Sequence, residues 1–384
     1  MGETGTAVVG LGFIGVTHVE MMHRLGRPVI GVQDENMDRA QEAARRLRVP
    51  KVYSSYAELL HDRHVDIVHI CTPNYLHYEM CKAALLAGKH VICEKPLAMN
   101  TGQSAELVDL AKDCGLVAVA NYNLRFYPLC HEARAKVRGG EIGDVRLIHG
   151  GYLQDWLFLP TDWNWRLESA RGGELRAVAD IGSHWLDTVS WITGLRITRV
   201  MADFATFMPK RFKPRREVDT FAGKVLKSHD VEEVEVDTED CATVLLRFDS
   251  GALGNVTISQ ISAGRKNHFW WELTGSQASV SWDSERPNEM WIGYRDEPNK
   301  LLLKDPALMH PEARAIAGFP GGHAEGYGDT FFRLYEAVYN YLDAGDFSQP
   351  ADFATFEDGH RQMVLCEAIL RSARQACWVQ VPAP

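Results

Sequence analysis

The sequence predicts an α/β protein that begins with a doubly wound parallel sheet and continues into an α+β region with a large, mostly antiparallel open sheet. Up to about residue 127, short apolar strands alternate with helices, as in parallel sheets that are covered on both faces. Beyond that point, longer segments alternate apolar and polar residues, as in a sheet with one covered face. The chain has 384 residues, 46% of them hydrophobic, which is enough for two cores. We therefore expect two domains, residues 1–127 and 128–384.

The first strand leads into a glycine-rich turn and a helix. Residues 6–15 read TAVVGLGFIG, in which Gly10, Gly12 and Gly15 fit the G-x-G-x-x-G pattern of dinucleotide-binding sites. The first glycine permits a tight turn, the second lets a pyrophosphate approach the backbone, and the third lets the helix pack on the strand. The helix N-terminus then offers free N–H groups and a partial positive charge. A plain structural turn is the alternative interpretation of this motif taken alone.

An acidic residue ends the second strand, residues 28–34. Asp34 lies 19 residues after Gly15, where a ribose-binding carboxylate belongs. Such a carboxylate accepts hydrogen bonds from ribose hydroxyls and repels a 2′-phosphate. The position therefore predicts NAD rather than NADP. The alternative is that Asp34 caps the helix that follows it.

The first region continues as alternating helices and strands. We expect helices at residues 14–25, 37–47, 56–61, 75–87 and 101–114, and further strands at residues 65–71, 90–93 and 116–120. Gly88 and Gly115 mark two of the helix ends. Ligands of such sheets bind beyond the carboxyl ends of the strands. The segments that follow strands should converge on one crevice, and they are residues 10–15, Asp34, 71–74, 93–96 and 121–123.

The second region has a different character. We expect helices at residues 129–138, 327–342 and 353–376, and strands at residues 145–153, 197–207, 242–248, 253–261, 269–274 and 278–282. Gly251 occupies the turn of one hairpin. Residues 210–240 are rich in charge and predict a long surface loop or an irregular arm.

The overall composition excludes several classes of function. A net charge of −10 disfavours partners such as nucleic acid and anionic membranes, which need a basic surface. No apolar run is long enough for a membrane span, and the immediate entry into a strand predicts that there is no signal peptide. The eight cysteines form no C-x-x-C pair, so we expect small core residues in a reducing, cytoplasmic setting. We also expect no metal site, since His18 and His23 lack a ligand spacing.

Two clusters could carry chemistry. Lys95, within Glu94-Lys95-Pro96, follows a strand and can donate to a substrate hydroxyl or take part in proton transfer. Its alternative is a surface Glu-Lys-Pro turn. Asp180 and His184 are four residues apart, so a helix that begins near Asp180 places both on one face. The carboxylate suits a substrate hydroxyl and the imidazole suits a general base. The alternative for this pair is a helix cap and a structural histidine.

The combination of these motifs resembles the Gfo/Idh/MocA family of sugar and inositol oxidoreductases. The resemblance extends over nearly the whole chain. It rests on residues 10–15, Asp34, residues 71–74 with His77, residues 94–96, residues 123–126 with Pro128, and residues 180–184 with Asp187. In many relatives Arg125 follows another arginine, whereas Leu124 stands here.

The resemblance implies a Rossmann domain followed by an α+β domain whose open sheet serves as the oligomer interface, in a homodimer or homotetramer. It implies Lys95, Asp180 and His184 as the catalytic set. The cofactor-binding residues that it implies, together with the glycine motif, are Gly10, Gly12, Phe13, Ile14, Gly15, Asp34, Thr72, Pro73, Asn74, His77, Glu94, Lys95, Asn123, Trp165 and Arg166. The bulky Phe13 leaves little room near an added phosphate, which agrees with NAD.

Substrate contacts should come from several loops. Trp156 lies in an aromatic segment, residues 152–166, which suits stacking on a sugar ring, although packing under a long loop explains the segment nearly as well. His323 precedes a helix and can enter the crevice, or it can face solvent. The substrate-binding residues that we expect are Lys95, Arg125, Trp156, Asp180, His184 and His323.

These features predict an NAD-dependent oxidoreductase that transfers a hydride between a ring secondary hydroxyl of a sugar, sugar derivative or cyclitol and the nicotinamide. One alternative is a keto-sugar reductase or a redox-neutral NAD-using enzyme of the same family. Another is a non-catalytic NAD-binding sugar sensor. A sensor needs neither Lys95 nor His184, and both are present.

Overall fold

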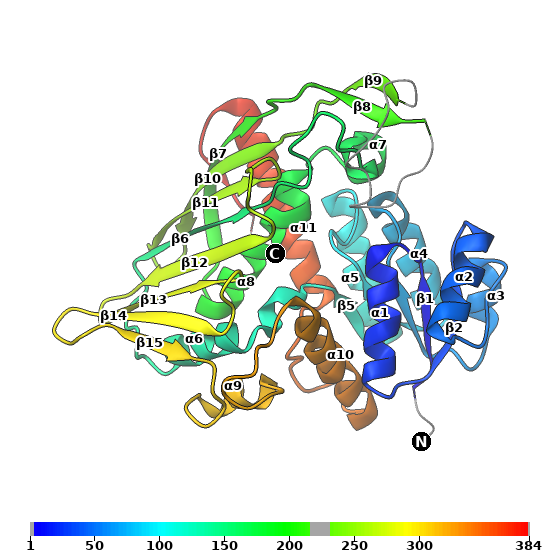
Figure 1. Ribbon diagram of the computed structural model, residues 1–384, viewed down its shortest axis with the longest axis horizontal. Helices are drawn as coiled ribbons and strands as arrows, with labels where there is room; N and C mark the ends of the chain where they lie inside the picture. Colours follow the sequence, from blue (N-terminus) through cyan, green and yellow to red (C-terminus); the bar gives the residue numbers. More distant parts are fainter. Residues whose placement is uncertain (1–3, 216–230, 383–384) are drawn as a thin grey trace. The chain divides into compact units, whose positions relative to one another are not determined.

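The computed structural model describes residues 4–215 and 231–382, which form two compact units (Figure 1). Neither unit is one continuous segment of the chain. The first unit comprises Met1–Asn123, Ala170–Gly173 and Phe331–Met363. The second unit comprises Leu124–Ser169, Glu174–Thr330 and Val364–Pro384.

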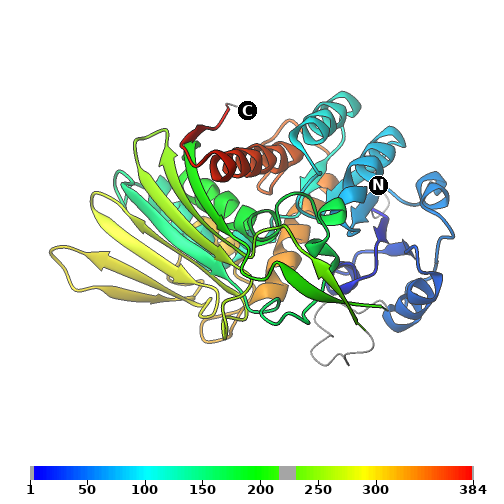
Figure 2. The same ribbon diagram turned by 90° about the horizontal axis from the view of Figure 1, so that it is seen from above.

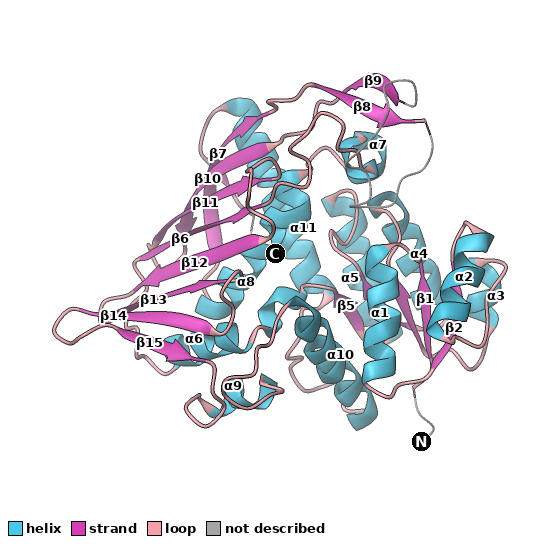
Figure 3. Cartoon of the chain, viewed as in Figure 1, coloured by secondary structure: helices cyan, strands magenta, loops and turns pink. Residues whose placement is uncertain are grey.

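The first unit is built on a five-stranded parallel sheet with the strand order β2-β1-β3-β4-β5. Its strands are β1 (Thr6–Val9), β2 (Val29–Gln33), β3 (Ile67–Ile70), β4 (His90–Cys93) and β5 (Ala118–Ala120). Its helices are α1 (Phe13–Arg24), α2 (Met37–Leu47), α3 (Tyr56–His61), α4 (Asn74–Leu86) and α5 (Thr101–Cys114). Figure 3 shows helices on both sides of this sheet, which confirms the predicted doubly wound architecture.

The local sequence explains why these elements form. Every residue of β1 and of β3 is buried, as in a parallel sheet covered on both faces. The side chains of Asn36, Ser55 and Asn100 accept N–H groups at the starts of α2, α3 and α5. Gly115 ends α5 in the left-handed conformation, with φ +65°.

A distant part of the chain completes the first unit. From Phe331 onward, α10 (Tyr327–Ala344) belongs to this unit, and its Tyr335 and Tyr339 are fully buried. Before α11 (Phe356–Gln375) begins, the carbonyl of Ala354 accepts the N–H of Ala120 at 3.0 Å. The first unit therefore depends on residues that lie more than 200 positions after its last strand.

The second unit contains a twisted nine-stranded sheet in the order β15-β14-β13-β12-β6-β11-β10-β7-β16 (Figure 2). Within the described residues, β6 and β11 are its one parallel pair, which confirms the predicted mostly antiparallel sheet. Its strands are β6 (Leu147–Leu153), β7 (Ile197–Ala205), β10 (Cys241–Phe248), β11 (Leu253–Ser259), β12 (His268–Thr274), β13 (Ala278–Asp283), β14 (Glu289–Tyr294), β15 (Lys300–Leu303) and β16 (Val379–Gln380).

Helices cover one face of this sheet. Residues of β10 alternate between buried and exposed, so one face is covered and the other is open. The helices of the second unit are α6 (Pro128–Arg138), α8 (Ser183–Thr193), α9 (Pro311–Ile316) and α11 from Val364 onward. The short α7 (Ser169–Gly172) lies almost wholly in the first unit, and 3-10 turns occur at Asn123–Phe126 and Trp165–Leu167. A Cβ on Gly150 of β6 would lie 2.6 Å from Nε1 of Trp185, so this glycine lets α8 pack closely against the sheet.

Three predictions need correction. Residues 210–240 are not wholly a loop, because β8 (Lys210–Pro214) and β9 (Val231–Glu235) form an antiparallel pair, while residues 216–230 lie outside the described residues. The strands β14 and β15 were not predicted. Cysteine burial holds for Cys81, Cys93, Cys130 and Cys366, but Cys114 and Cys377 are exposed.

None of the helices in the described ranges 4–215 and 231–382 combines the length and the apolar composition that crossing a membrane requires.

Candidate active site

The glycine motif of the first unit has the geometry that its spacing predicts. Gly10 has φ +83°, and a Cβ on Gly15 would lie 1.8 Å from the carbonyl oxygen of Gly10. A Cβ on Gly12 would meet nothing within 4 Å, so the backbone is open there. No side chain caps the N-terminus of α1. Open backbone in front of an uncapped helix N-terminus fits a bound pyrophosphate.

Asp34 holds the turn and keeps acceptor capacity for a ribose. Its Oδ2 accepts the N–H of Leu11 at 2.7 Å, and its Oδ1 accepts the N–H of Asn36 at 2.9 Å. The cap of α2 is Asn36, so Asp34 is not the cap of that helix. Because a carboxylate has about four acceptor positions, both oxygens can still accept a hydroxyl. Nε of Arg39 lies 3.4 Å from Oδ1.

The loop after β3 is tied to the loop after β4. His77 is buried, with Nε2 2.8 Å from the carbonyl oxygen of Thr72 and Nδ1 2.7 Å from that of Pro96. The buried imidazole therefore lies between the carbonyl oxygens of the two loops. The side chain of Asn74 donates to the carbonyl of Gly172 at 2.8 Å. These contacts fix the backbone of two predicted cofactor-binding loops.

Glu94 is a partly buried carboxylate at the end of β4. Its Oε1 accepts from Asn121 and lies 3.2 Å from Nε2 of His18, and its Oε2 accepts the N–H of Lys95 at 3.2 Å. Burial opposes the charge, but the hydrogen bond and the imidazole of His18, with the charge of Lys95, hold the pKa of Glu94 below its usual value. Glu94 and Lys95 therefore form one corner of the site, which we call the Glu94–Lys95 corner.

Asp180 of the second unit lies in a π-helical turn, Val178–Gly182, that leads directly into α8. A helical segment begins near Asp180 as predicted, but its first turn is π-helical rather than α-helical. A Cβ on Gly182 would lie 2.5 Å from Cδ1 of Ile258, so a glycine allows this turn to rest against β11. Such turns accommodate an extra residue and often mark functional sites.

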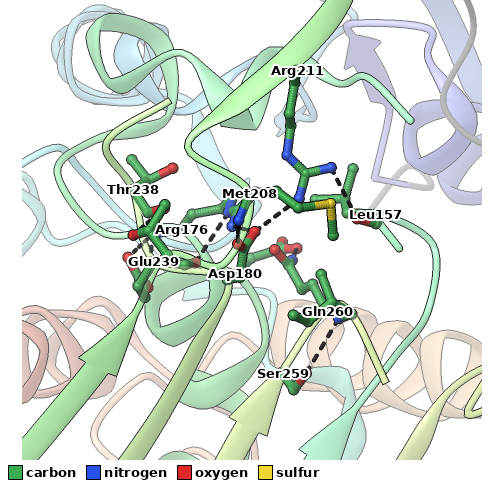
Figure 4. A network of polar contacts seen from close by, with 12 residues as sticks. Leu157, Arg176, Asp180, Met208, Arg211, Thr238, Glu239, Ser259 and Gln260 are labelled. Atoms are coloured by element: carbon green, nitrogen blue, oxygen red, sulfur yellow. Dashed lines mark hydrogen bonds and ion pairs between the residues drawn. The ribbon is translucent and has the colours of Figure 1, made fainter. Parts of the chain in front are cut away.

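Two donors fix the Asp180 carboxylate. Nε of Arg166 donates to Oδ1 at 3.0 Å. Nε2 of Gln260 donates to Oδ2 at 2.8 Å (Figure 4). The guanidinium of Arg166 also lies 4.4 Å from the centre of the Trp165 ring. Gln260 is fully buried. Sequence analysis missed Gln260, whose one signal was its place directly after a strand.

An ionic clamp, which we define as Arg176, Arg211, Asp240 and Glu239, supports the π turn (Figure 4). Oδ1 of Asp240 accepts from Arg176 and, at 2.7 Å, from Arg211. Oε1 of Glu239 accepts the N–H groups of Arg176 and Val178, each at 2.9 Å, and so caps the turn. All four side chains of the clamp are buried. Asp240 thus pairs with both arginines, while Glu239, whose pKa burial raises, caps the turn that carries Asp180.

Tyr152 lies beside the predicted catalytic residue His184, and sequence analysis did not single it out. Its ring centre lies 6.4 Å from that of His184, which is buried in the first turn of α8. Burial, with smaller contributions from nearby tyrosines and from Asp180, raises the pKa of Tyr152 well above its usual value. Tyr152 therefore remains a neutral phenol, and its OH donates to Asn267 at 2.8 Å.

Three predicted substrate-binding residues have other partners. Nε and Nη2 of Arg125 donate to the two carboxylate oxygens of the buried Asp187. Trp156 packs against a small apolar cluster that contains Leu157, and its Nε1 donates to Gln154 at 2.8 Å. His323 is exposed on its loop.

One group of potential metal ligands lies elsewhere in the second unit. His268, Asp283 and Glu285 place their ligand atoms within 4.8 Å of one another. Glu285 is exposed and forms an ion pair with Arg265 at 2.7 Å. The group includes none of the predicted site residues.

Comparison with known proteins agrees with this geometry. Residues 4–122 match the family described as "Oxidoreductase family, NAD-binding Rossmann fold", and residues 130–281 match the "GFO/IDH/MocA C-terminal domain". Levoglucosan dehydrogenase from Pseudarthrobacter phenanthrenivorans is 29% identical over 397 residues, which cover 100% of this chain and 99% of that protein. Myo-inositol 2-dehydrogenase from Thermotoga maritima is 28% identical over 254 residues, which cover 66% and 67% of the two chains.

The fold is also that of solved structures. Levoglucosan dehydrogenase in complex with NADH and L-sorbose superposes with a TM-score of 0.89 at 28% identity, and each chain covers 100% of the other. The family matches account for both the parallel sheet of the first unit and much of the open sheet of the second. The chain therefore belongs to the Gfo/Idh/MocA family of oxidoreductases and joins an NAD-binding Rossmann domain to the C-terminal domain of that family.

Proposed function

We propose that this protein is an NAD-dependent dehydrogenase that oxidises a ring secondary hydroxyl of a sugar, sugar derivative or cyclitol. The observation that carries the proposal is the Asp180 carboxylate, held by Arg166 and Gln260 one helical turn before His184. Support also comes from the full-length similarity to levoglucosan dehydrogenase, which has been solved with NADH and a sugar. We assign NAD binding to residues 1–127 and substrate binding to residues 128–384.

The proposed roles follow from the chemistry of each side chain. Asp180, fixed by two donors, accepts a hydroxyl next to the reacting carbon and so orients the ring. His184 accepts the proton of the reacting hydroxyl on an imidazole nitrogen, directly or through Lys95. The ammonium of Lys95 stabilises the negative charge that develops on the oxygen. NAD, when bound, accepts the hydride.

The proposed cofactor contacts lie in the first unit. Gly10, Gly12, Phe13, Ile14 and Gly15 would hold the pyrophosphate, and Asp34 would accept the ribose hydroxyls. The remaining proposed contacts are Thr72, Pro73, Asn74, His77, Glu94, Lys95 and Asn123, with Trp165 and Arg166 at the nicotinamide end. The carboxylate of Asp34 favours NAD over NADP, because it would repel a 2′-phosphate.

The open face of the nine-stranded sheet supports a proposed homodimer or homotetramer. Large apolar side chains are exposed on its strands, namely Leu245, Leu253, Trp291, Leu301 and Leu303. Apolar patches of this kind mark interfaces between proteins. Sedimentation velocity should give a dimer or tetramer, and Leu245→Glu should shift it towards monomer. A monomeric wild-type protein would refute this part of the proposal.

The function is tested by the reduction of NAD and of NADP, followed by absorbance, against anhydrosugars, inositols, aldoses, ketoses and glycosides. We expect activity with NAD on at least one cyclic polyol. Lys95→Ala should retain NADH binding, measured by fluorescence, and should lower kcat by about 10²- to 10⁴-fold. Normal turnover of Lys95→Ala, or no turnover of the wild type on any member of the panel, would contradict the proposal.

A further inference from the structure

A chain of buried polar side chains crosses the first unit behind Glu94. Nε2 of His18 lies 3.2 Å from Oε1 of Glu94, and Nδ1 of His18 lies 2.9 Å from Nδ1 of His69. Nε2 of His69 lies 3.0 Å from the OH of Tyr339, which in turn contacts Oγ1 of Thr6. The side chains come from α1, β3, α10 and β1, and all four are fully buried. We call His18, His69, Tyr339 and Thr6 the histidine chain.

Hydrogen-bond counting fixes the direction of this chain when Glu94 is ionised. A carboxylate only accepts, so Nε2 of His18 must donate. If His18 is neutral, its Nδ1 is bare and accepts from Nδ1 of His69. Nε2 of His69 is then bare and accepts from Tyr339, whose oxygen accepts from Thr6. Every donor points towards Glu94.

One added proton gives a second consistent arrangement. If Nδ1 of His18 takes up the proton, both of its nitrogens donate, and Nδ1 of His69 must accept. His69 then carries its own proton on Nε2 and donates to Tyr339, which donates to Thr6. The net change is one proton gained by the chain, and every hydrogen bond reverses except the one to Glu94.

The surroundings favour a neutral His69. Burial, with the adjacent imidazole of His18, holds the pKa of His69 well below its usual value. The rings of Tyr335 and Phe331 pack around His18 at 5.0 and 5.8 Å between ring centres. Arg27 and Asp66 are the charged groups that act on Tyr339. A second proton on His69 is therefore costly.

Glu94 is surrounded by groups from every strand end nearby. Lys95 follows it in the chain, and Asn121 donates to it. Burial, with a smaller contribution from the nearby charge of Glu94, raises the pKa values of the Cys71 and Cys93 thiols. A protonated Glu94 would lose acceptor strength towards Asn121 and the N–H of Lys95. The position of Lys95 thus depends on the charge of Glu94.

We propose that His18 is a positioning residue that keeps Glu94 ionised beside Lys95, and that the hydrogen bonds of the histidine chain reverse together when His18 takes up a proton. The inference rests on the proposed function only for the role of Lys95. It gives the histidine chain a role in the reaction. Glu94 accepts the backbone N–H of Lys95, so the orientation of the Glu94 carboxylate affects the position of Lys95.

Two substitutions by amide side chains distinguish the roles of the two ring nitrogens of His18. The amide of His18→Gln lies where Nε2 lies and can still donate to Glu94, whereas the amide of His18→Asn lies where Nδ1 lies and cannot. We expect His18→Gln to keep kcat near the wild-type value, because its amide still donates to Glu94. His18→Asn should lower kcat by about tenfold with little change in KM, because Glu94 would lose its buried donor beside Lys95. Equal kcat values in the two variants, with both folded by thermal melting, would overturn the assignment of His18.

Imidazole nitrogen NMR tests the chain without any substrate. On the ¹⁵N-histidine-labelled protein above pH 7, we expect a proton on Nε2 of His18 and on Nδ1 of His69, with a scalar coupling between the two Nδ1 atoms. His18→Gln and His69→Gln assign the signals. If this pattern is found in a protein that oxidises no sugar, the histidine chain is supported and the proposed function is rejected. The opposite tautomers above pH 7, or no coupling at any pH, would reject the chain even in an active dehydrogenase.

Discussion

Each unit of the molecule has a buried polar network behind a proposed catalytic residue, and the two networks differ in kind. The ionic clamp of the second unit is built on permanent charges, because Asp240 forms ion pairs with both Arg176 and Arg211. The histidine chain of the first unit consists of groups that are neutral in at least one arrangement. A network of permanent charges can hold a geometry but has only one hydrogen-bond direction. A network of imidazoles and hydroxyls can keep the same geometry while its hydrogen bonds point in either of two directions.

The directions in which the pKa values of Asp240 and His69 are shifted explain this difference. Burial opposes the charge of Asp240, but the two arginines hold its pKa below its usual value, so the carboxylate stays ionised near neutrality. Burial lowers the pKa of His69, so that imidazole stays neutral in the same range. The ionic clamp is therefore suited to holding the π turn in place. The histidine chain is suited to changing the direction of its hydrogen bonds when it gains a proton.

The largest effect is expected from breaking the clamp. Asp240→Asn leaves two buried guanidinium groups without their shared carboxylate, and we expect the free energy of unfolding to fall by about 3–5 kcal/mol. Urea unfolding measures this loss. The exposed Asp237→Asn is the matched control and should change stability by less than about 0.5 kcal/mol. A loss below about 1 kcal/mol for Asp240→Asn would mean that the clamp carries little stability.

The next effect concerns the support of Asp180. Gln260→Met keeps a similar volume but removes the donor to Oδ2, which is worth about 1.5–3 kcal/mol for a charged acceptor. We expect kcat/KM to fall by about 10- to 100-fold, measured on the substrate that the panel identifies. Gln277→Met, at an exposed glutamine of the same unit, should leave kcat/KM unchanged. Unchanged kinetics in Gln260→Met would remove Gln260 from the site.

The pH dependence of stability should separate the two networks. Below its usual pKa of 6.5, His69 is protonated in the unfolded chain but stays neutral in the folded protein. The free energy of unfolding should therefore fall by about 1.4 kcal/mol per pH unit below that value. His131, whose pKa burial lowers to about 3, contributes with the same sign in the second unit. Asp240, with a lowered pKa, stabilises the fold above its usual value of 3.8 and loses this effect only as the pH falls further.

Urea midpoints at pH 7, 6 and 5 test this separation. His69→Gln and His131→Gln should each remove one part of the dependence of the unfolding free energy on pH, and the double variant should remove both parts. Asp240→Asn should keep the wild-type slope over this range despite its lower stability. A flat wild-type profile between pH 7 and 5 would contradict the neutral state of both histidines.

The smallest effect is expected at the end of the histidine chain. Tyr339→Phe removes the hydroxyl that joins His69 to Thr6, and we expect a loss of about 1 kcal/mol in the free energy of unfolding. Tyr341→Phe, on the same helix, removes an exposed hydrogen bond to Gln349 and should cost less. Equal losses in the two variants would indicate that the buried hydroxyl has no special role.

Much of the fold follows from local patterns in the sequence. The turn at Gly10, the place of Asp34 just after a strand and the helix end at Gly115 follow local sequence patterns, so spacing alone predicts them. The hairpin of β8 and β9 was missed because its strands carry charged rather than alternating apolar residues. Arg211 is buried there only because Asp240, 29 positions later, receives its charge.

The candidate site was predictable only in part, for the same reason. Lys95, Asp180 and His184 belong to short motifs. Gln260 contacts Asp180 across 80 residues, and His69 contacts His18 across 51. No local periodicity marks such pairs. The π turn was also missed, because one extra residue in a helix leaves no distinct pattern in an apolar segment.

The return of α10 to the first unit has a consequence for the order of events during synthesis. The ribosome completes all five parallel strands by residue 120, yet Tyr335 and Tyr339, which pack on His18 and His69, emerge more than 200 residues later. The core on this side of the Rossmann sheet therefore stays incomplete until nearly the whole polypeptide has been translated. A gene fragment that stops at residue 127 would encode every strand of that sheet and still lack the helix that closes it.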